Sequence, residues 1–143
     1  MNSGINQVIE TYKTSVFAKD VDSLMRLYDE RVMIFDAWDT WTYEGAVAWR
    51  KSVERWFSSL ETGKVRVNLT DVQTTVGQEL AVVNAIVTYT GVSPEGKDIH
   101  SLQNRITWVL RLNGADWKII HEHTSVPVDF DSSKAIFQRK KDP

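Results

Sequence analysis

Residues 117–125, Trp117-Lys118-Ile119-Ile120-His121-Glu122-His123-Thr124-Ser125 (WKIIHEHTS), are the most informative stretch for the fold. Side chains alternate between the two faces of a β-strand, so Trp117, Ile119, His121, His123 and Ser125 share one face. Lys118, Ile120, Glu122 and Thr124 share the other face, which its charged pair marks as more solvated. The alternation therefore predicts a strand with both histidines pointing inward.

The segments before this strand also have strand character. Residues 64–76, 79–90 and 98–112 alternate or are rich in β-branched residues, and 116–128 continue the pattern. Turn signals separate them at 76–78, at 91–96 and at Asn113-Gly114. Four sequential strands with short connections predict an antiparallel meander.

The first half of the chain has the period of helices. Apolar residues three or four apart predict a helix from Ile5 to Phe17, and a second helix follows, with Asp20 as its N-cap and a stripe that extends to Tyr28. After a β-like run at 32–38 (VMIFDAW), Gly45 precedes a third helix that ends near Gly63. Three helices and a long sheet predict an α+β fold, in which the helices pack on one face of a strongly curved antiparallel sheet with a pocket at its open end.

Composition limits the classes of function. With 42% hydrophobic and 25% charged residues and a net charge of −2, the chain predicts a globular protein with neither nucleic acid nor a membrane as partner. It has no cysteine, and its first residues lack the apolar segment of a secretory signal, so we expect a cytoplasmic location. We expect one domain over 1–130 and a polar tail over 131–143, as a loose arm or a short helix contacting a partner chain.

Tryptophan is unusually frequent. The chain has six tryptophans, and Trp38, Trp41, Trp49 and Trp56 fall within 19 residues. Large aromatic side chains can wall a ligand cavity or fill a bulky core. We take Trp38, Trp49 and Trp56 as candidate ligand-binding residues.

Asp36 and the histidine pair are the candidate groups for chemistry. Two imidazoles at i and i+2 on a strand can ligate a metal with Asp36 as a third arm, but this pattern alone is weakly specific, so we expect no metal. They can also move protons, line a pocket or form buried hydrogen bonds. Asp36 lies among apolar and aromatic neighbours, where burial would raise its pKa, or it serves as a turn acceptor.

Arg105 lies in a strand whose other face is apolar. If Arg105 points into the pocket, the inner face of residues 98–112 is cationic and Arg105 binds a ligand. An apolar stripe of Ile106, Trp108, Leu110 and Leu112 then lies on the outer sheet face. This arrangement predicts a homodimer through the outer sheet face.

The order of these motifs resembles the nuclear transport factor 2-like superfamily, and within it the SnoaL-like group. The most specific part is Arg105-Ile-Thr107, Arg111-Leu-Asn-Gly114 and 117–125. This ending, and Tyr43-Glu44-Gly45, are also similar to the association domain of calcium/calmodulin-dependent protein kinase II. The resemblance implies a cone-shaped α+β fold, a deep pocket and a homodimer.

The superfamily includes ketosteroid isomerase, which has a catalytic tyrosine on its first helix and a general base after its first short strand. Residues 8–12 (VIETY) and 32–38 resemble these two segments, so the resemblance implies Tyr12 and Asp36 as pocket groups. The isomerase has a third member, a protonated aspartic acid that donates to the oxyanion. Trp108 stands near that place, and this departure argues against steroid isomerisation.

Two functions remain open from the sequence. The first is a cofactor-free isomerase, cyclase or dehydratase in which Asp36, Tyr12, His121 or His123 does acid–base chemistry on a polar or anionic small molecule. The second is a non-catalytic ligand-binding or oligomerisation domain.

Overall fold

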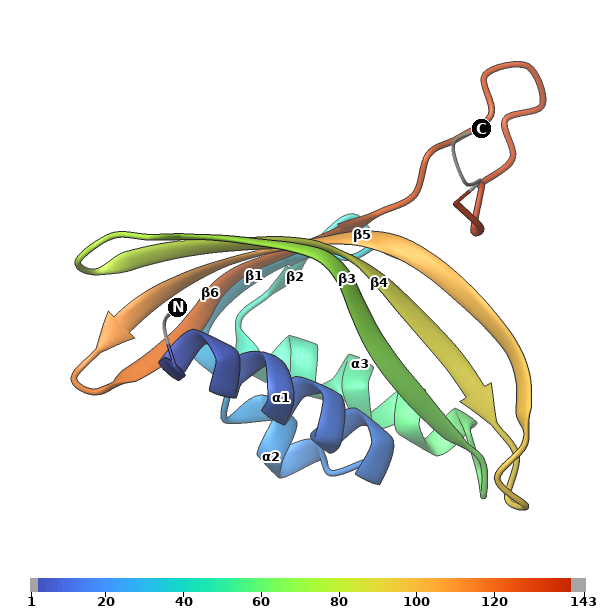
Figure 1. The fold of residues 1–143 in the computed structure, drawn as a ribbon, viewed down its shortest axis with the longest axis horizontal. Coiled ribbons are helices and arrows are strands. Elements are labelled where there is room, and N and C mark those ends of the chain that lie inside the picture. Colours follow the sequence, from blue (N-terminus) through green and yellow to red (C-terminus); the bar gives the residue numbers. More distant parts are fainter. Residues whose placement is uncertain (1–2, 140–143) are drawn as a thin grey trace.

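A curved six-stranded sheet covers three helices in the computed structural model, which describes residues 3–139 (Figure 1). The elements along the chain are α1 (Ser3–Ala18), α2 (Val21–Met25), β1 (Tyr28–Phe35), β2 (Tyr43–Glu44), α3 (Ala46–Ser59), β3 (Lys64–Val76), β4 (Leu80–Val92), β5 (Asp98–Asn113) and β6 (Asp116–Ser125). The sheet order is β2-β1-β6-β5-β4-β3, and the helices lie against its concave face. The predicted α+β fold is confirmed.

The sheet is antiparallel except at one pair of strands. β3, β4, β5 and β6 form the predicted meander, whereas β1 pairs with β6 in parallel. α2 ends at Met25, and β1 begins at Tyr28, a residue that the helical pattern assigned to the second helix. The predicted cap of α2 is present, because a side-chain oxygen of Asp20 accepts a hydrogen bond from the amide of Ser23 at 3.1 Å.

The apolar face of β5 forms the core and not the outer surface. Ile106, Trp108 and Leu110 are all buried, and Arg105 is exposed on the opposite side, where its Nε donates to Ser125 Oγ at 3.0 Å. The predicted inward orientation of Arg105 is wrong, because burying the large apolar side chains stabilises the fold more than burying a guanidinium would. The apolar stripe proposed for a dimer is therefore inside the molecule.

The outer sheet face carries other apolar residues. Val82 and Phe35 are exposed there, and Ile86 and Val109 are half-buried. A homodimer through this face stays a prediction.

A β-bulge in β6 reverses the faces of its C-terminal half. Val109 pairs with His121 and Leu110 pairs with Ile119, so Ile120 has no partner on β5. Trp117 and Ile119 are buried before the bulge, and Glu122 and Thr124 are buried after it. The prediction that His121 and His123 point inward is therefore wrong, since they share their face with Phe35 on the outer side of the sheet.

The described part of the tail folds back on the sheet. Val128 forms a bridge with Ala135, and the amide of Gln103 on β5 donates to the carbonyl of Phe137 at 2.8 Å. Residues 137–139 therefore pack on their own chain, so the predicted loose arm is attached at this end, while residues 127–136 form an exposed loop that projects from the sheet (Figure 1). Residues 140–143 lie outside the described part. None of the described helices is long and apolar enough to cross a membrane.

Candidate functional site

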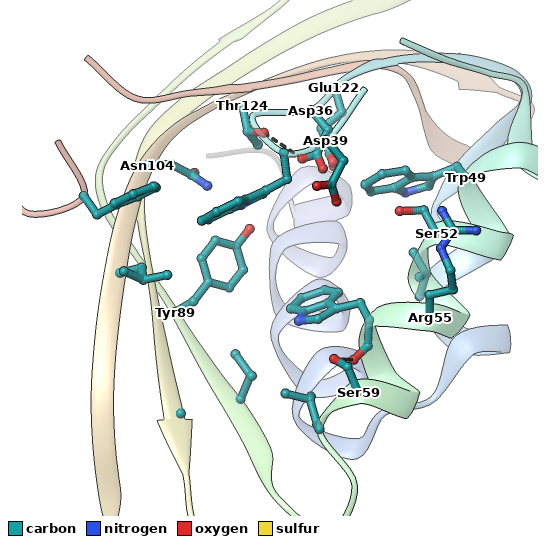
Figure 2. Close-up of a pocket in the computed structure, with 18 of the residues that line it drawn as sticks. Asp36, Asp39, Trp49, Ser52, Arg55, Ser59, Tyr89, Asn104, Glu122 and Thr124 are labelled. Carbon is teal, nitrogen blue, oxygen red and sulfur yellow. Dashed lines mark hydrogen bonds between the residues drawn. The ribbon is translucent and has the colours of Figure 1, made fainter. Parts of the chain in front are cut away.

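A cavity of about 500 Å³ lies between the concave face of the sheet and helices α1 and α3 (Figure 2). Its aromatic lining comes from elements far apart in sequence, namely Tyr12, Trp38, Tyr43, Trp49, Trp56, Tyr89 and Phe137. The three tryptophans taken as ligand-binding candidates thus lie on its wall and leave the space between them open. The size and the aromatic walls are typical of a small-molecule site.

Asp36 lies at one end of this cavity, directly after β1. Its Oδ1 accepts a hydrogen bond from Thr124 Oγ1 at 2.9 Å, and the same Oγ1 accepts from the amide of Ala37 at 2.9 Å. Burial raises the pKa of Asp36, while hydrogen bonds from Thr124 and from the amides of Ala37 and Trp38 lower it in part. The net direction is upward, which makes this carboxyl a better base than an ordinary aspartate.

Glu122 is a second carboxyl on the cavity wall. Only 2% of the residue is exposed, and Oε1 accepts hydrogen bonds from the Tyr28 hydroxyl at 2.6 Å and from Trp108 Nε1 at 2.7 Å. Burial raises the pKa of Glu122 to about 7, because it outweighs the two hydrogen bonds, and the nearby charge of Asp36 adds to the rise. Near neutral pH this carboxyl can therefore either give or take a proton.

Two tyrosines stand beside the carboxyls. The hydroxyl groups of Tyr12 on α1 and Tyr89 on β4 are 2.9 Å apart, and the Tyr12 ring packs edge-on against Trp108 with centroids 5.1 Å apart. Burial raises the pKa of both tyrosines, so both hydroxyls keep their protons. Figure 2 shows the Tyr89 hydroxyl pointing toward the end of the cavity that holds Asp36. One proton of this pair is free to bond a ligand oxygen, since the other joins the two tyrosines.

The loop after β1 closes part of the cavity. The amide of Thr40 donates to the carbonyl of Trp38 at 2.8 Å across Asp39, whose φ of 67° is left-handed and costly for a non-glycine residue. This γ-turn places both Trp38 and Asp39 on the cavity wall. The Trp38 ring stacks on Phe137 with centroids 5.1 Å apart and planes 4° apart, so the tail holds the loop in place.

The candidates from the sequence divide into two groups. Tyr12 and Asp36 lie on the cavity wall with the three tryptophans. Arg105, His121 and His123 lie on the outer side of the sheet, where His121 Nδ1 donates to the Met33 carbonyl at 2.8 Å. The cavity therefore lacks the arginine and histidines that suggested an anionic ligand.

Three site residues were not predicted from the sequence, namely Glu122, Thr124 and Tyr89. The first two were assigned to the solvated face because strict alternation was assumed through the whole of β6. The signal for the bulge was the doublet Ile119-Ile120, since two consecutive apolar residues interrupt the alternation. Within the described residues, no group of three or more histidine, aspartate or glutamate side chains could hold a metal ion.

Residues 5–129 match the model of the SnoaL-like domain family. The chain belongs to the SnoaL-like family. No curated protein matches this SnoaL-like chain significantly. A nuclear transport factor 2-like protein of unknown function from Pseudomonas putida has 26% identity and a TM-score of 0.85, with 97% of this chain and 95% of that chain covered.

More distant structures share the fold of the SnoaL-like chain. A putative calcium/calmodulin-dependent protein kinase II association domain from Xanthomonas campestris has 16% identity and a TM-score of 0.72, with 85% and 84% of the two chains covered. Aln2 from a Streptomyces species has 8% identity and a TM-score of 0.76, with 86% and 88% covered. The SnoaL-like fold and its cavity together indicate a ligand-binding or isomerase-type domain.

Proposed function

We propose that this SnoaL-like domain binds a small, uncharged, ring-containing carbonyl compound and moves a proton at the carbon beside the carbonyl. The observation that carries the proposal is that Asp36 and Glu122 line one aromatic-walled cavity, and that burial raises the pKa of both. Two carboxyls with raised pKa values in one closed site are typical of acid–base catalysis.

The roles follow from the surroundings of each group. Asp36 is the base that takes the proton from carbon, because it lies on the cavity wall and burial raises its pKa. The Tyr12–Tyr89 hydroxyl pair donates to the carbonyl oxygen as negative charge develops on it. Glu122 accepts or returns the proton at neutral pH, because its pKa is about 7. Such proton transfer requires no cofactor.

The cavity wall argues for an uncharged ligand. Asp36, Asp39 and Glu122 contribute carboxyls, while the two basic side chains on the wall, Arg55 on α3 and His100 on β5, are exposed. An anionic ligand would be repelled by these carboxyls in a poorly solvated space. This proposal therefore replaces the polar or anionic substrate expected from the sequence.

Proton exchange tests the proposal directly. In D₂O, 2-tetralone and 1-indanone carry exchangeable hydrogens beside their carbonyl groups, and proton NMR follows their loss. The wild type should accelerate exchange over buffer, and Asp36→Asn should reduce that acceleration about 100-fold or more. His123→Gln, on the outer face, is the matched control and should exchange like the wild type.

Two results would contradict the catalytic proposal. Exchange no faster than in buffer, or Asp36→Asn that exchanges as fast as the wild type, would remove the proton-transfer role. Ketone binding without exchange would instead support the second function, a non-catalytic ligand-binding domain built on the same cavity.

A further inference from the structure

The carboxamide of Asn104 is an unused polar group on the cavity wall. Asn104 lies on the inward face of β5, two residues before the buried Ile106, and Figure 2 shows its side chain projecting from the strand into the cavity. Its Oδ1 is buried and has no hydrogen-bond partner among the described residues. Buried polar atoms are nearly always paired, and an unpaired one destabilises the fold. Asn104 therefore has a side-chain carbonyl oxygen that no hydrogen bond of the fold uses.

The neighbouring amide makes the contrast clear. Gln103 Nε2 donates to Thr88 Oγ1 at 3.2 Å, and Gln103 Oε1 accepts from the amide of Arg139 at 2.8 Å. The same chemical group, one residue away, is thus engaged at both ends by β4 and the tail. Gln103 holds structure together, whereas Asn104 presents its amide to the cavity.

The amide also defines what could satisfy it. An asparagine side chain offers a donor and an acceptor along one edge, and its terminal torsion is broad, so rotation about this torsion can bring the buried Oδ1 to the cavity beside Nδ2. A ligand with a carbonyl beside an N–H matches this edge with two hydrogen bonds. The rings of Trp38, Trp56 and Tyr89 in the same cavity favour a planar molecule.

We infer that Asn104 orients the ligand, and that the ligand is an uncharged planar ring compound bearing a carboxamide or lactam group. The ligand carbonyl accepts from Asn104 Nδ2 and the ligand N–H donates to Oδ1. This inference rests on the proposed function, because it names the ligand class of the same cavity. It assigns to Asn104 a positioning role and no part in moving the proton.

The first test needs no ligand. Asn104→Leu keeps the approximate shape and removes the unpaired amide, so the ligand-free variant should unfold about 3 °C above the wild type. Gln103→Leu is the matched control and should unfold below the wild type, because it breaks two hydrogen bonds. A melting temperature of Asn104→Leu that falls as far as that of Gln103→Leu would overturn the inference, since Asn104 would then be structural.

The second test uses two probes of the same ring system, 2-naphthamide and 2-methylnaphthalene, with binding followed by quenching of tryptophan fluorescence. The wild type should prefer 2-naphthamide by about 10-fold, and Asn104→Leu should bind both probes alike. Asn104→Asp, which keeps the shape but loses the donor, should also lose the preference. An unchanged preference in both variants would overturn the inference.

Probe binding and ketone exchange together distinguish the ligand class from the catalytic role of the cavity. A 2-naphthamide preference that depends on Asn104, together with no ketone exchange, supports the ligand class and contradicts only the catalytic proposal. No binding of either probe to the wild type contradicts both, because the cavity would then not accept planar rings.

Discussion

The indole nitrogen of Trp108 on β5 donates to Glu122 Oε1 on β6 at 2.7 Å, in the buried interior beside the cavity. In the sequence, the departure of Trp108 from the isomerase pattern argues against steroid isomerisation, because that pattern has an aspartic acid near this position. The acid is instead supplied from the next strand, where the bulge at Ile120 turns Glu122 inward. The buried interior therefore holds an acid with a raised pKa, Glu122, and its hydrogen-bond donor, Trp108. This arrangement differs from that of the isomerase, in which an aspartic acid stands near the position of Trp108.

The raised pKa of Glu122 predicts a pH-dependent stability. The folded pKa is about 7 against an ordinary value of 4.5, so the folded state holds a proton that the unfolded state releases. The contribution of Glu122 is thus fully present below pH 4.5 and is lost as the pH rises through about 7. Between these limits, the free energy of unfolding of the wild type should fall by about 3 kcal/mol relative to Glu122→Gln.

Urea unfolding of both proteins across this pH range measures that difference. All other titrating groups are common to the two proteins, so the difference isolates Glu122. Parallel stability curves would show that Glu122 has an ordinary pKa in the folded protein.

Thr124 on β6 holds the start of the loop after β1, because its hydroxyl donates to the Asp36 carboxyl and accepts from the amide of Ala37. Thr124→Val keeps the shape but removes both bonds, and should lower the free energy of unfolding by about 1–3 kcal/mol. It should also move the pH profile of ketone exchange upward, because the lost hydrogen bond had lowered the pKa of Asp36. Thr107→Val, on the outer face of β5, is the control, and an equal loss of stability there would contradict the role of Thr124.

The tail should control access to the cavity through Phe137. Phe137→Ala removes the ring that stacks on Trp38, so dissociation of 2-naphthamide should become several-fold faster in stopped-flow fluorescence. Phe130→Ala is the matched control, because it removes a phenyl ring from the same tail at a position where the residue is 96% exposed. Dissociation rates that remain equal in the two variants would show that Phe137 does not hold the cavity closed.

His121 and His123 on β6 should tolerate substitution. His123 is exposed on the outer sheet face beside Phe35, with ring centroids 5.5 Å apart. His123→Gln should change the free energy of unfolding by less than about 0.5 kcal/mol and leave probe binding unaltered. A large loss of 2-naphthamide affinity in a fluorescence titration would return His123 to the ligand site.

The sequence predicted what depends on period and turn chemistry. The helices, the meander, the Asp20 cap and the position of Asp36 after the first strand follow from local spacing. The tryptophan cluster left a cavity wall and a bulky core both open, and Trp38, Trp49 and Trp56 lie on the cavity wall. Alternation predicts which side of the sheet a side chain lies on only while the strand pairing is regular. The extra residue Ile120 in β6 therefore turns His121 outward and Glu122 inward. The inward face of β5 was misassigned because one arginine was given more weight than the apolar side chains beside it.

Tertiary packing decides the remaining features. The tail is polar in sequence, yet the Phe137 ring stacks on Trp38 and the Phe137 carbonyl accepts from the amide of Gln103 on β5. The unpaired amide of Asn104 depends on what surrounds it in space, and no local pattern distinguishes it from Gln103.

The proposed function requires that Glu122, a carboxyl in the cavity, exchange a proton near neutral pH. The most direct measurement is a carbon-13 NMR titration of the glutamate side-chain carboxyls, with Glu122→Gln to assign the signal. One carboxyl should titrate with a midpoint near pH 7 and be missing from the spectrum of the variant. Titration of every glutamate near the ordinary value of 4.5 would contradict the account.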